Sequence, residues 1–210
     1  MKKLVIKKLL KIICAGVLVF LLSLLKISFV WGSRKTFFSG MCMITPILAQ
    51  VFGFWSVGLG LLFVFPSITF GIPTIVACAC WRWEGVFLNI IVPLGCLMVF
   101  VLHPSVGYGF WFGFYWLIPV LLHVMQLTKI INRSIFITAI KSTLVAHAVG
   151  SVMWCYFVPM TPERWLALIP IVAVERLVFA SGMVIAHRIL KSFRISKINL
   201  ITKRLLSCIT

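Results

Sequence analysis

Ionisable side chains inside apolar runs are the residues of this sequence that could do chemistry. Glu175 and Arg176 lie close to the middle of an apolar run at about 165–187, and His147 lies near the middle of another at 135–157. An ionisable residue within a membrane span is costly, so it is a functional-site hypothesis by default. The two runs are consecutive, and as antiparallel neighbours they would place His147 and Glu175 at similar depth. We therefore expect His147 to be a partner of Glu175.

The charged residues of the last run are adjacent in the chain. Neighbours on a helix point about 100° apart, so we expect that Glu175 and Arg176 do not pair face to face. Each then needs a partner on another helix or a water-filled cavity. Glu175 would serve as a hydrogen-bond acceptor or a counter-ion.

The helix face that carries His147 holds further residues suited to a polar ligand. Residues three, four and seven positions after His147 share its side of a helix, and these are Gly150, Ser151 and Trp154. Ala146 and Gly150 are a pair of small residues that lets helices approach closely. This face either lines a ligand pocket or makes a structural hydrogen bond between helices. The predicted ligand-binding residues are His147, Ser151, Trp154, Glu175 and Arg176.

Most enzyme signatures are missing from the sequence. It contains no HExxH, GxSxG, P-loop or Rossmann fingerprint. With only three acidic residues, chemistry based on paired carboxylates is nearly excluded. The seven cysteines lie mostly in apolar runs and lack zinc-site spacing, so we interpret them as small apolar residues. We expect no enzyme activity, no cofactor and no metal, although catalysis by His147 or Glu175 is left open.

The composition indicates contact with a lipid bilayer. Hydrophobic residues make up 62% of the 210 residues and charged residues only 11%, whereas soluble domains are about 25% charged. The net charge is +17, but the cations gather at the ends of apolar segments, which argues against nucleic acid as a partner. This pattern predicts a multi-pass protein of the plasma (inner) membrane with both termini cytoplasmic. The terminal cations are Lys2, Lys3, Lys7, Lys8, Lys11, Arg188, Lys191, Arg194, Lys197, Lys203 and Arg204.

The hydrophobic runs predict an all-α fold, a polytopic bundle of about six transmembrane helices. We divide the chain into a basic cytoplasmic N-terminus (1–11), one transmembrane domain (12–187) and a basic cytoplasmic tail (188–210). The tail is either an amphipathic helix on the inner leaflet or a solvated segment. Thr161 and Pro162, followed by Glu163, predict the start of the last helix. The apolar runs lie at about 12–31, 37–80, 86–103, 109–128, 135–157 and 165–187.

The run at 37–80 is predicted to be broken or re-entrant. Its 44 residues contain repeated prolines and glycines. The basic start, the loop holding Lys129 and Arg133, and the basic tail should all be cytoplasmic, which requires this run to cross an odd number of times. One crossing plus a re-entrant piece satisfies that requirement and would form a cavity wall. The alternative is two ordinary short helices.

An aromatic run at 108–116 permits two interpretations. Trp and Tyr are enriched where membrane spans meet water, so the run is predicted to be an interfacial belt. It could instead stack against a flat ligand. Trp81 and Trp83, which flank Arg82, are interpreted as part of the same kind of belt.

The segment Thr45–Gly58, with the sequence TPILAQVFGFWSVG, resembles a recurring element of the substrate-binding (S) components of energy-coupling-factor vitamin transporters. In that family a Pro-x-x-x-Ala/Gly segment precedes a turn and a glycine-rich helix. The resemblance implies six spans, cytoplasmic termini and a bound vitamin-like solute. It also implies a separate transmembrane scaffold subunit and ATPase subunits.

The leading hypothesis is a small-solute membrane transporter or its membrane-embedded substrate-binding subunit. It depends on the broken 37–80 run and on the polar residues at mid-depth in the last two runs. The alternative is a membrane scaffold or assembly protein without a ligand, and a membrane enzyme is a third hypothesis.

Overall fold

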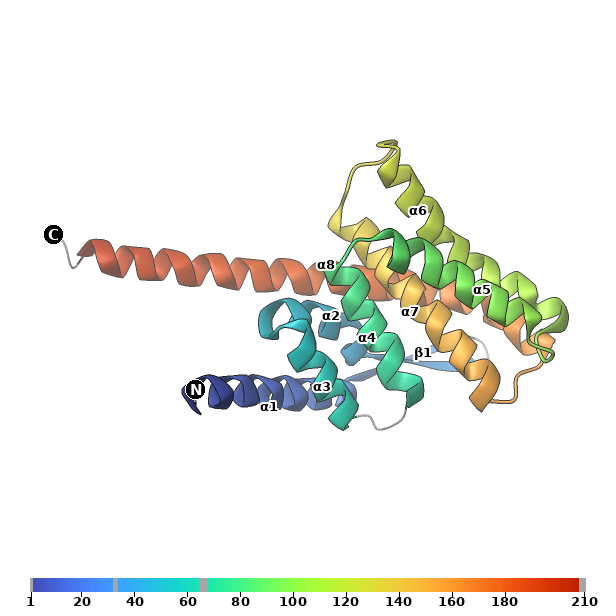
Figure 1. The fold of residues 1–210 in the computed structure, drawn as a ribbon, viewed down its shortest axis with the longest axis horizontal. Helices are drawn as coiled ribbons and strands as arrows, with labels where there is room; N and C mark the ends of the chain where they lie inside the picture. Colours follow the sequence, from blue (N-terminus) through green and yellow to red (C-terminus); the bar gives the residue numbers. More distant parts are fainter. Residues whose placement is uncertain (1, 32–33, 65–67, 208–210) are drawn as a thin grey trace.

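The computed structural model describes residues 2–31, 34–64 and 68–207, with side chains described for 9–25, 40–62 and 71–193. The described chain is mainly helical, with one pair of antiparallel strands (Figure 1). Its elements are α1 (Lys2–Leu24), β1 (Lys26–Trp31), β2 (Arg34–Ser39), α2 (Gly40–Phe52), α3 (Phe54–Val64), α4 (Ile68–Arg82), η1 (Phe87–Ile91), α5 (Val92–Leu102), η2 (Gly107–Trp116), α6 (Leu117–Leu127), α7 (Ile135–Phe157) and α8 (Pro162–Ser207).

Among the described residues, three helical segments are long and apolar enough to cross a membrane. They are Gly107–Leu127, Ile135–Phe157 and the part of α8 from Pro162 to Phe193. Shorter apolar helices occupy Leu9–Leu24, Gly40–Phe52 and Phe87–Leu102. The helical fold class is confirmed, and these helices are compatible with an integral membrane protein. The number of six spans stays a prediction.

The first apolar run departs from the expected span at 12–31. Its helix ends at Leu24, and β1 pairs antiparallel with β2, with Lys26 opposite Ser39 and Trp31 opposite Arg34. The β1 sequence KISFVW is rich in β-branched and aromatic residues, which favour strands. Pairing with β2 satisfies the backbone groups that the ended helix no longer satisfies.

The run at 37–80 is divided into the three short helices α2, α3 and α4. Gly53 separates α2 from α3 with a φ of +91°, a conformation that glycine adopts without steric cost. Pro46 lies inside α2 and Pro73 inside α4. Helices of 11 to 15 residues are about 16–22 Å long, shorter than the ~30 Å hydrocarbon core. The expected break is therefore present, while the number of crossings stays a prediction.

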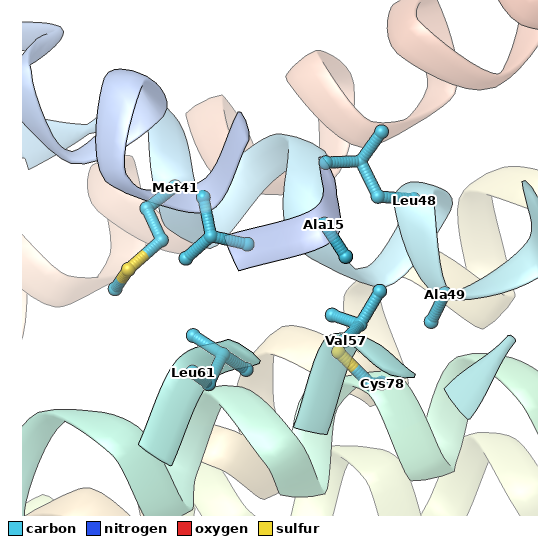
Figure 2. Close-up of a cluster of buried hydrophobic side chains, with 8 residues drawn as sticks. Ala15, Met41, Leu48, Ala49, Val57, Leu61 and Cys78 are labelled. Atoms are coloured by element: carbon cyan, nitrogen blue, oxygen red, sulfur yellow. The ribbon is translucent and has the colours of Figure 1, made fainter. Parts of the chain in front are cut away.

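The N-terminal helices pack through an apolar cluster and one close backbone contact. Eight buried residues from α1, α2, α3 and α4 meet in this cluster (Figure 2). Gly16 of α1 lies directly against Gly60 of α3, so that a Cβ on Gly60 would approach the Gly16 Cα atom to 3.0 Å. The cluster consists of Ala15, Val19, Met41, Leu48, Ala49, Val57, Leu61 and Cys78.

The basic loops gather at one end of the bundle. Trp81, at the end of α4, lies 5.9 Å from the ring of His187 in α8, and Arg133 contacts Glu84 across two loops. This is the end from which α8 leaves the bundle, and both termini point in that direction (Figure 1). By the positive-inside rule this end is predicted to be cytoplasmic.

The last helix is continuous through the predicted boundary at residue 188. It has 46 residues, which corresponds to about 69 Å, more than twice the thickness of the hydrocarbon core. Its C-terminal half projects away from the other helices (Figure 1). The helix therefore continues from the candidate span into the predicted basic tail, and the division of the chain at residue 188 stays a prediction. The helix starts at Pro162 with Glu163 in its first turn, as expected.

Candidate functional site

The two charged residues of α8 pair with each other. Arg176 Nη2 lies 2.7 Å from Glu175 Oε2, and both side chains are mostly buried. This corrects the expectation that adjacent residues would not pair. The 100° separation describes the directions in which the two Cβ atoms leave the helix. The long, flexible arginine side chain overcomes that angle, because a buried charge gains most from its nearest counter-ion.

The Arg176 guanidinium also ties α8 to α7. Its Nη1 donates a hydrogen bond to the Thr143 carbonyl at 3.2 Å. Its central carbon lies 4.7 Å from the centre of the Phe179 ring, within the range of a cation–π interaction. Nε is buried and has no hydrogen-bond partner among the described residues. One donor of the guanidinium is therefore unused at the centre of the bundle.

His147 lies near this pair but is not hydrogen-bonded to Glu175. Its ring is 5.4 Å from the ring of Phe112, and it is close enough to Arg176 for an electrostatic interaction. Its Nε2 is buried without a hydrogen-bond partner in the described part of the chain. The expected pairing of His147 with Glu175 is not formed, because Glu175 is taken by Arg176.

The remaining predicted residues divide between the interior and the surface. Ser151 is buried, whereas Trp154 is 38% exposed. Gly150 packs against α4, where a Cβ would lie 3.4 Å from Pro73 Cγ. The structure thus brings His147, Glu175 and Arg176 together. It shows no side-chain hydrogen bond from Ser151 or Trp154 to that group.

An aromatic cluster adjoins His147. Phe112 and Trp116 of η2 pack with Phe100 of α5 and Trp165 of α8, and ring centres lie 4.9 Å apart for Phe100 and each tryptophan. All four side chains are fully buried. The run at 108–116 is therefore only partly an exposed belt, formed by Tyr108, Trp111 and Phe114. Its inward half forms a protein core, with edge-to-face ring contacts.

A second polar group, centred on Lys141 of α7, was not among the predicted site residues. Lys141 is 1% exposed. Its Nζ donates to Gln126 Oε1 at 2.6 Å and lies 3.5 Å from Glu84 Oε1. The Thr138 hydroxyl donates to the same Glu84 oxygen at 2.5 Å. The signal in the sequence is a lysine inside the apolar run 135–157.

The environment of Glu84 favours its ionised form. Partial burial alone would raise the pKa of this carboxyl group. The hydrogen bond from Thr138 and the charges of Lys141 and Arg133 together outweigh that effect, so the pKa lies below its ordinary value. Glu84 is therefore a carboxylate at neutral pH, held between two cations.

No protein-family model matches the chain, and no curated protein sequence or solved structure matches it either. Within the described ranges, no three His, Cys, Asp or Glu side chains gather as metal ligands would. Inferences about function therefore rest on the residues themselves.

Proposed function

We propose that the chain is a small-solute membrane transporter or the membrane-embedded substrate-binding subunit of one. The observation that carries the proposal is the group formed by Glu175, Arg176 and His147. It lies near the middle of two helices long enough to span a membrane. Ionisable groups kept at that depth commonly mark a substrate or ion pathway.

The hydrogen-bonding capacity of the group favours a polar solute. Arg176 Nε is a donor without a partner, and His147 Nε2 is either a donor or an acceptor without a partner, among the described residues. A solute with a carboxylate or carbonyl group would satisfy both atoms and would compete with Glu175 for the guanidinium. The adjoining aromatic cluster would contact the apolar part of the solute.

The source of energy would lie outside this chain. The resemblance of Thr45–Gly58 to S components of energy-coupling-factor transporters supports a vitamin-like solute, a transmembrane scaffold subunit and separate ATPase subunits. The charge pattern supports the plasma (inner) membrane with cytoplasmic termini. In this proposal the chain binds the solute and catalyses no reaction.

The test begins with native mass spectrometry of the purified protein, which should detect a co-purified small molecule. That molecule should then raise the melting temperature of the wild type but not that of Glu175→Gln. The matched control is Glu163→Gln, the same substitution in the same helix, placed near the membrane boundary and bonded to Tyr108. Unchanged stabilisation of Glu175→Gln by the solute would refute the assignment of this residue.

The second candidate is a membrane scaffold or assembly protein without a ligand. The direct contact between Glu175 and Arg176 favours it, because the two charges neutralise each other without a solute. This candidate predicts that no small molecule co-purifies. It also predicts that Glu175→Gln lowers stability by the same amount under all solute conditions.

A further inference from the structure

The polar group around Lys141 lies where three elements meet at the basic end of the bundle. Lys141 comes from the first half of α7, Gln126 from the end of α6, and Glu84 from the segment between α4 and η1. Arg133, in the loop between α6 and α7, contacts the other oxygen of Glu84. This group is separate from the Arg176 group, which joins α8 to α7.

The group has more hydrogen-bond donors than it uses. The lysine ammonium has three N–H donors, of which the described contacts use one at 2.6 Å and one at 3.5 Å. Gln126 Nε2 is buried without a partner among the described residues. Both ring nitrogens of His123 are also buried and unpartnered there, and this residue is only 4% exposed. Leaving a buried polar atom without a hydrogen bond is unfavourable, so these atoms favour the binding of a polar partner.

These polar residues lie near one another. His123 and Gln126 are three residues apart on α6, which places them on one side of the helix. Gln126 is bonded to Lys141, and His123 is close enough to Lys141 and Glu84 for electrostatic interaction. A neutral His123 ring has one N–H donor and one acceptor nitrogen. With His123 neutral, Lys141, Arg133 and Glu84 together carry a net charge of +1. The partner that meets an excess of donors and of positive charge is an oxyanion.

The two cations lie at long distances from Glu84, whose Oε1 accepts its short hydrogen bond from the Thr138 hydroxyl at 2.5 Å. Glu84 lies 3.5 Å from Lys141 Nζ and 3.5 Å from Arg133 Nε, whereas tight charge-assisted hydrogen bonds measure about 2.7–2.9 Å. Arg133 has 74% of its side chain exposed, so it offers an approach from solvent. Glu84 also belongs to a segment that leads into the π-helix η1, a rare geometry that is frequent at functional sites.

We propose that Lys141, Gln126 and His123 form a binding site for an oxyanion, a carboxylate or phosphate group, for which Glu84 competes as the resident carboxylate. The anion approaches past Arg133 and takes up the unused donors. The bound oxyanion belongs either to a free small molecule or to the headgroup of an anionic lipid, since the site lies at the predicted cytoplasmic surface.

The experiment measures the melting temperature of the full chain in detergent against increasing inorganic phosphate or acetate, with ionic strength held constant by chloride. The wild type should show a saturable rise. Glu84→Gln should bind the anion at least about threefold more tightly, because the competing carboxylate is removed. Lys141→Gln should lose the response, and Arg133→Gln should weaken it by about threefold, a change of about 0.7 kcal/mol.

A matched variant completes the test. Lys129→Gln neutralises a cation of the same loop that has no described ion pair. This variant should keep the wild-type response to phosphate. If Lys141→Gln does not fold, the exposed Arg133→Gln and the charge-removing Glu84→Gln still decide the question.

A second measurement of phosphate binding, in lipid nanodiscs, identifies the source of the oxyanion. In phosphatidylcholine nanodiscs, added phosphatidylglycerol should weaken phosphate binding if a headgroup occupies the site, and should leave it unchanged if the ligand is soluble. The proposal is overturned if neither phosphate nor acetate gives a saturable response in the wild type or Glu84→Gln, in detergent and in phosphatidylcholine nanodiscs. A response that Lys129→Gln abolishes as fully as Lys141→Gln would overturn it as well.

Discussion

Gly60→Ala adds one methyl group at the contact between α1 and α3, and its effect on stability follows from the geometry of that contact. A Cβ on Gly60 would lie 3.0 Å from both the Cα and the N atom of Gly16, and 3.5 Å from the carbonyl carbon of Ala15. These are backbone atoms, which cannot rotate away as a side chain can. In Gly60→Ala the two helices must therefore move apart. Gly58, two residues earlier on α3, has nothing within 4 Å of its hypothetical Cβ.

The pair of variants isolates the packing cost. Overpacking of a closely packed contact costs about 1–3 kcal/mol. Alanine also gains about 1 kcal/mol over glycine in a helix interior. This gain applies to both substitutions and cancels in their difference. We expect Gly60→Ala to be about 1–3 kcal/mol less stable than Gly58→Ala.

Reversible unfolding in mixed micelles, followed by tryptophan fluorescence, gives the two free energies of unfolding. Because only the difference between the variants is used, the micelle composition affects both equally. Equal free energies, or a more stable Gly60→Ala, would refute the close approach of α1 and α3.

Three further predictions concern other parts of the bundle. Folding lowers the pKa of Glu84, so its ionisation adds stability at neutral pH that is lost as the pH falls through the folded pKa. Thr138→Val removes one of the hydrogen bonds that lower this pKa. The melting temperature of Thr138→Val should therefore fall less between pH 7 and about 3 than that of the wild type. Ser142→Ala removes the hydrogen bond from Oγ to the Ala77 carbonyl at 2.8 Å, and its free energy of unfolding should drop by about 0.6–1.7 kcal/mol. Gly182→Ala meets the flexible end of Met43, so unfolding assays should show a smaller loss than for Gly60→Ala.

The parts of the fold that depend on local sequence were predictable. The span at 135–157 coincides with α7, and the start of α8 at Pro162 follows the expected signal. The end of α1 at Leu24 was missed, because hydropathy does not distinguish an apolar helix from the apolar strand that follows it. The break at Gly53 followed from composition, while the division of 37–80 into three helices did not.

The sequence predicted which residues of the candidate site lie near one another, but not which of them form contacts. Depth in the spans predicted His147 as a partner of Glu175, and the structure instead shows Glu175 paired with Arg176. That ion pair between adjacent residues depends on side-chain flexibility, which a helical wheel does not describe. The Lys141 group joins residues 15 and 57 positions apart. Such contacts depend on how the helices pack, and no pattern in the sequence reports that packing.

Because α8 is one unbroken helix, a tilt of its buried part displaces its far end. Arg176 fixes the buried part of this helix to Thr143 of α7, while roughly 20 residues beyond Arg188 extend about 30 Å from the bundle. A tilt of about 10° at the buried part would move the far end by about 5 Å. Spin labels on the extension and on α7 would record that movement as a change in distance. A rearrangement at one buried arginine would thus appear at the far end of α8 as a displacement of several ångströms.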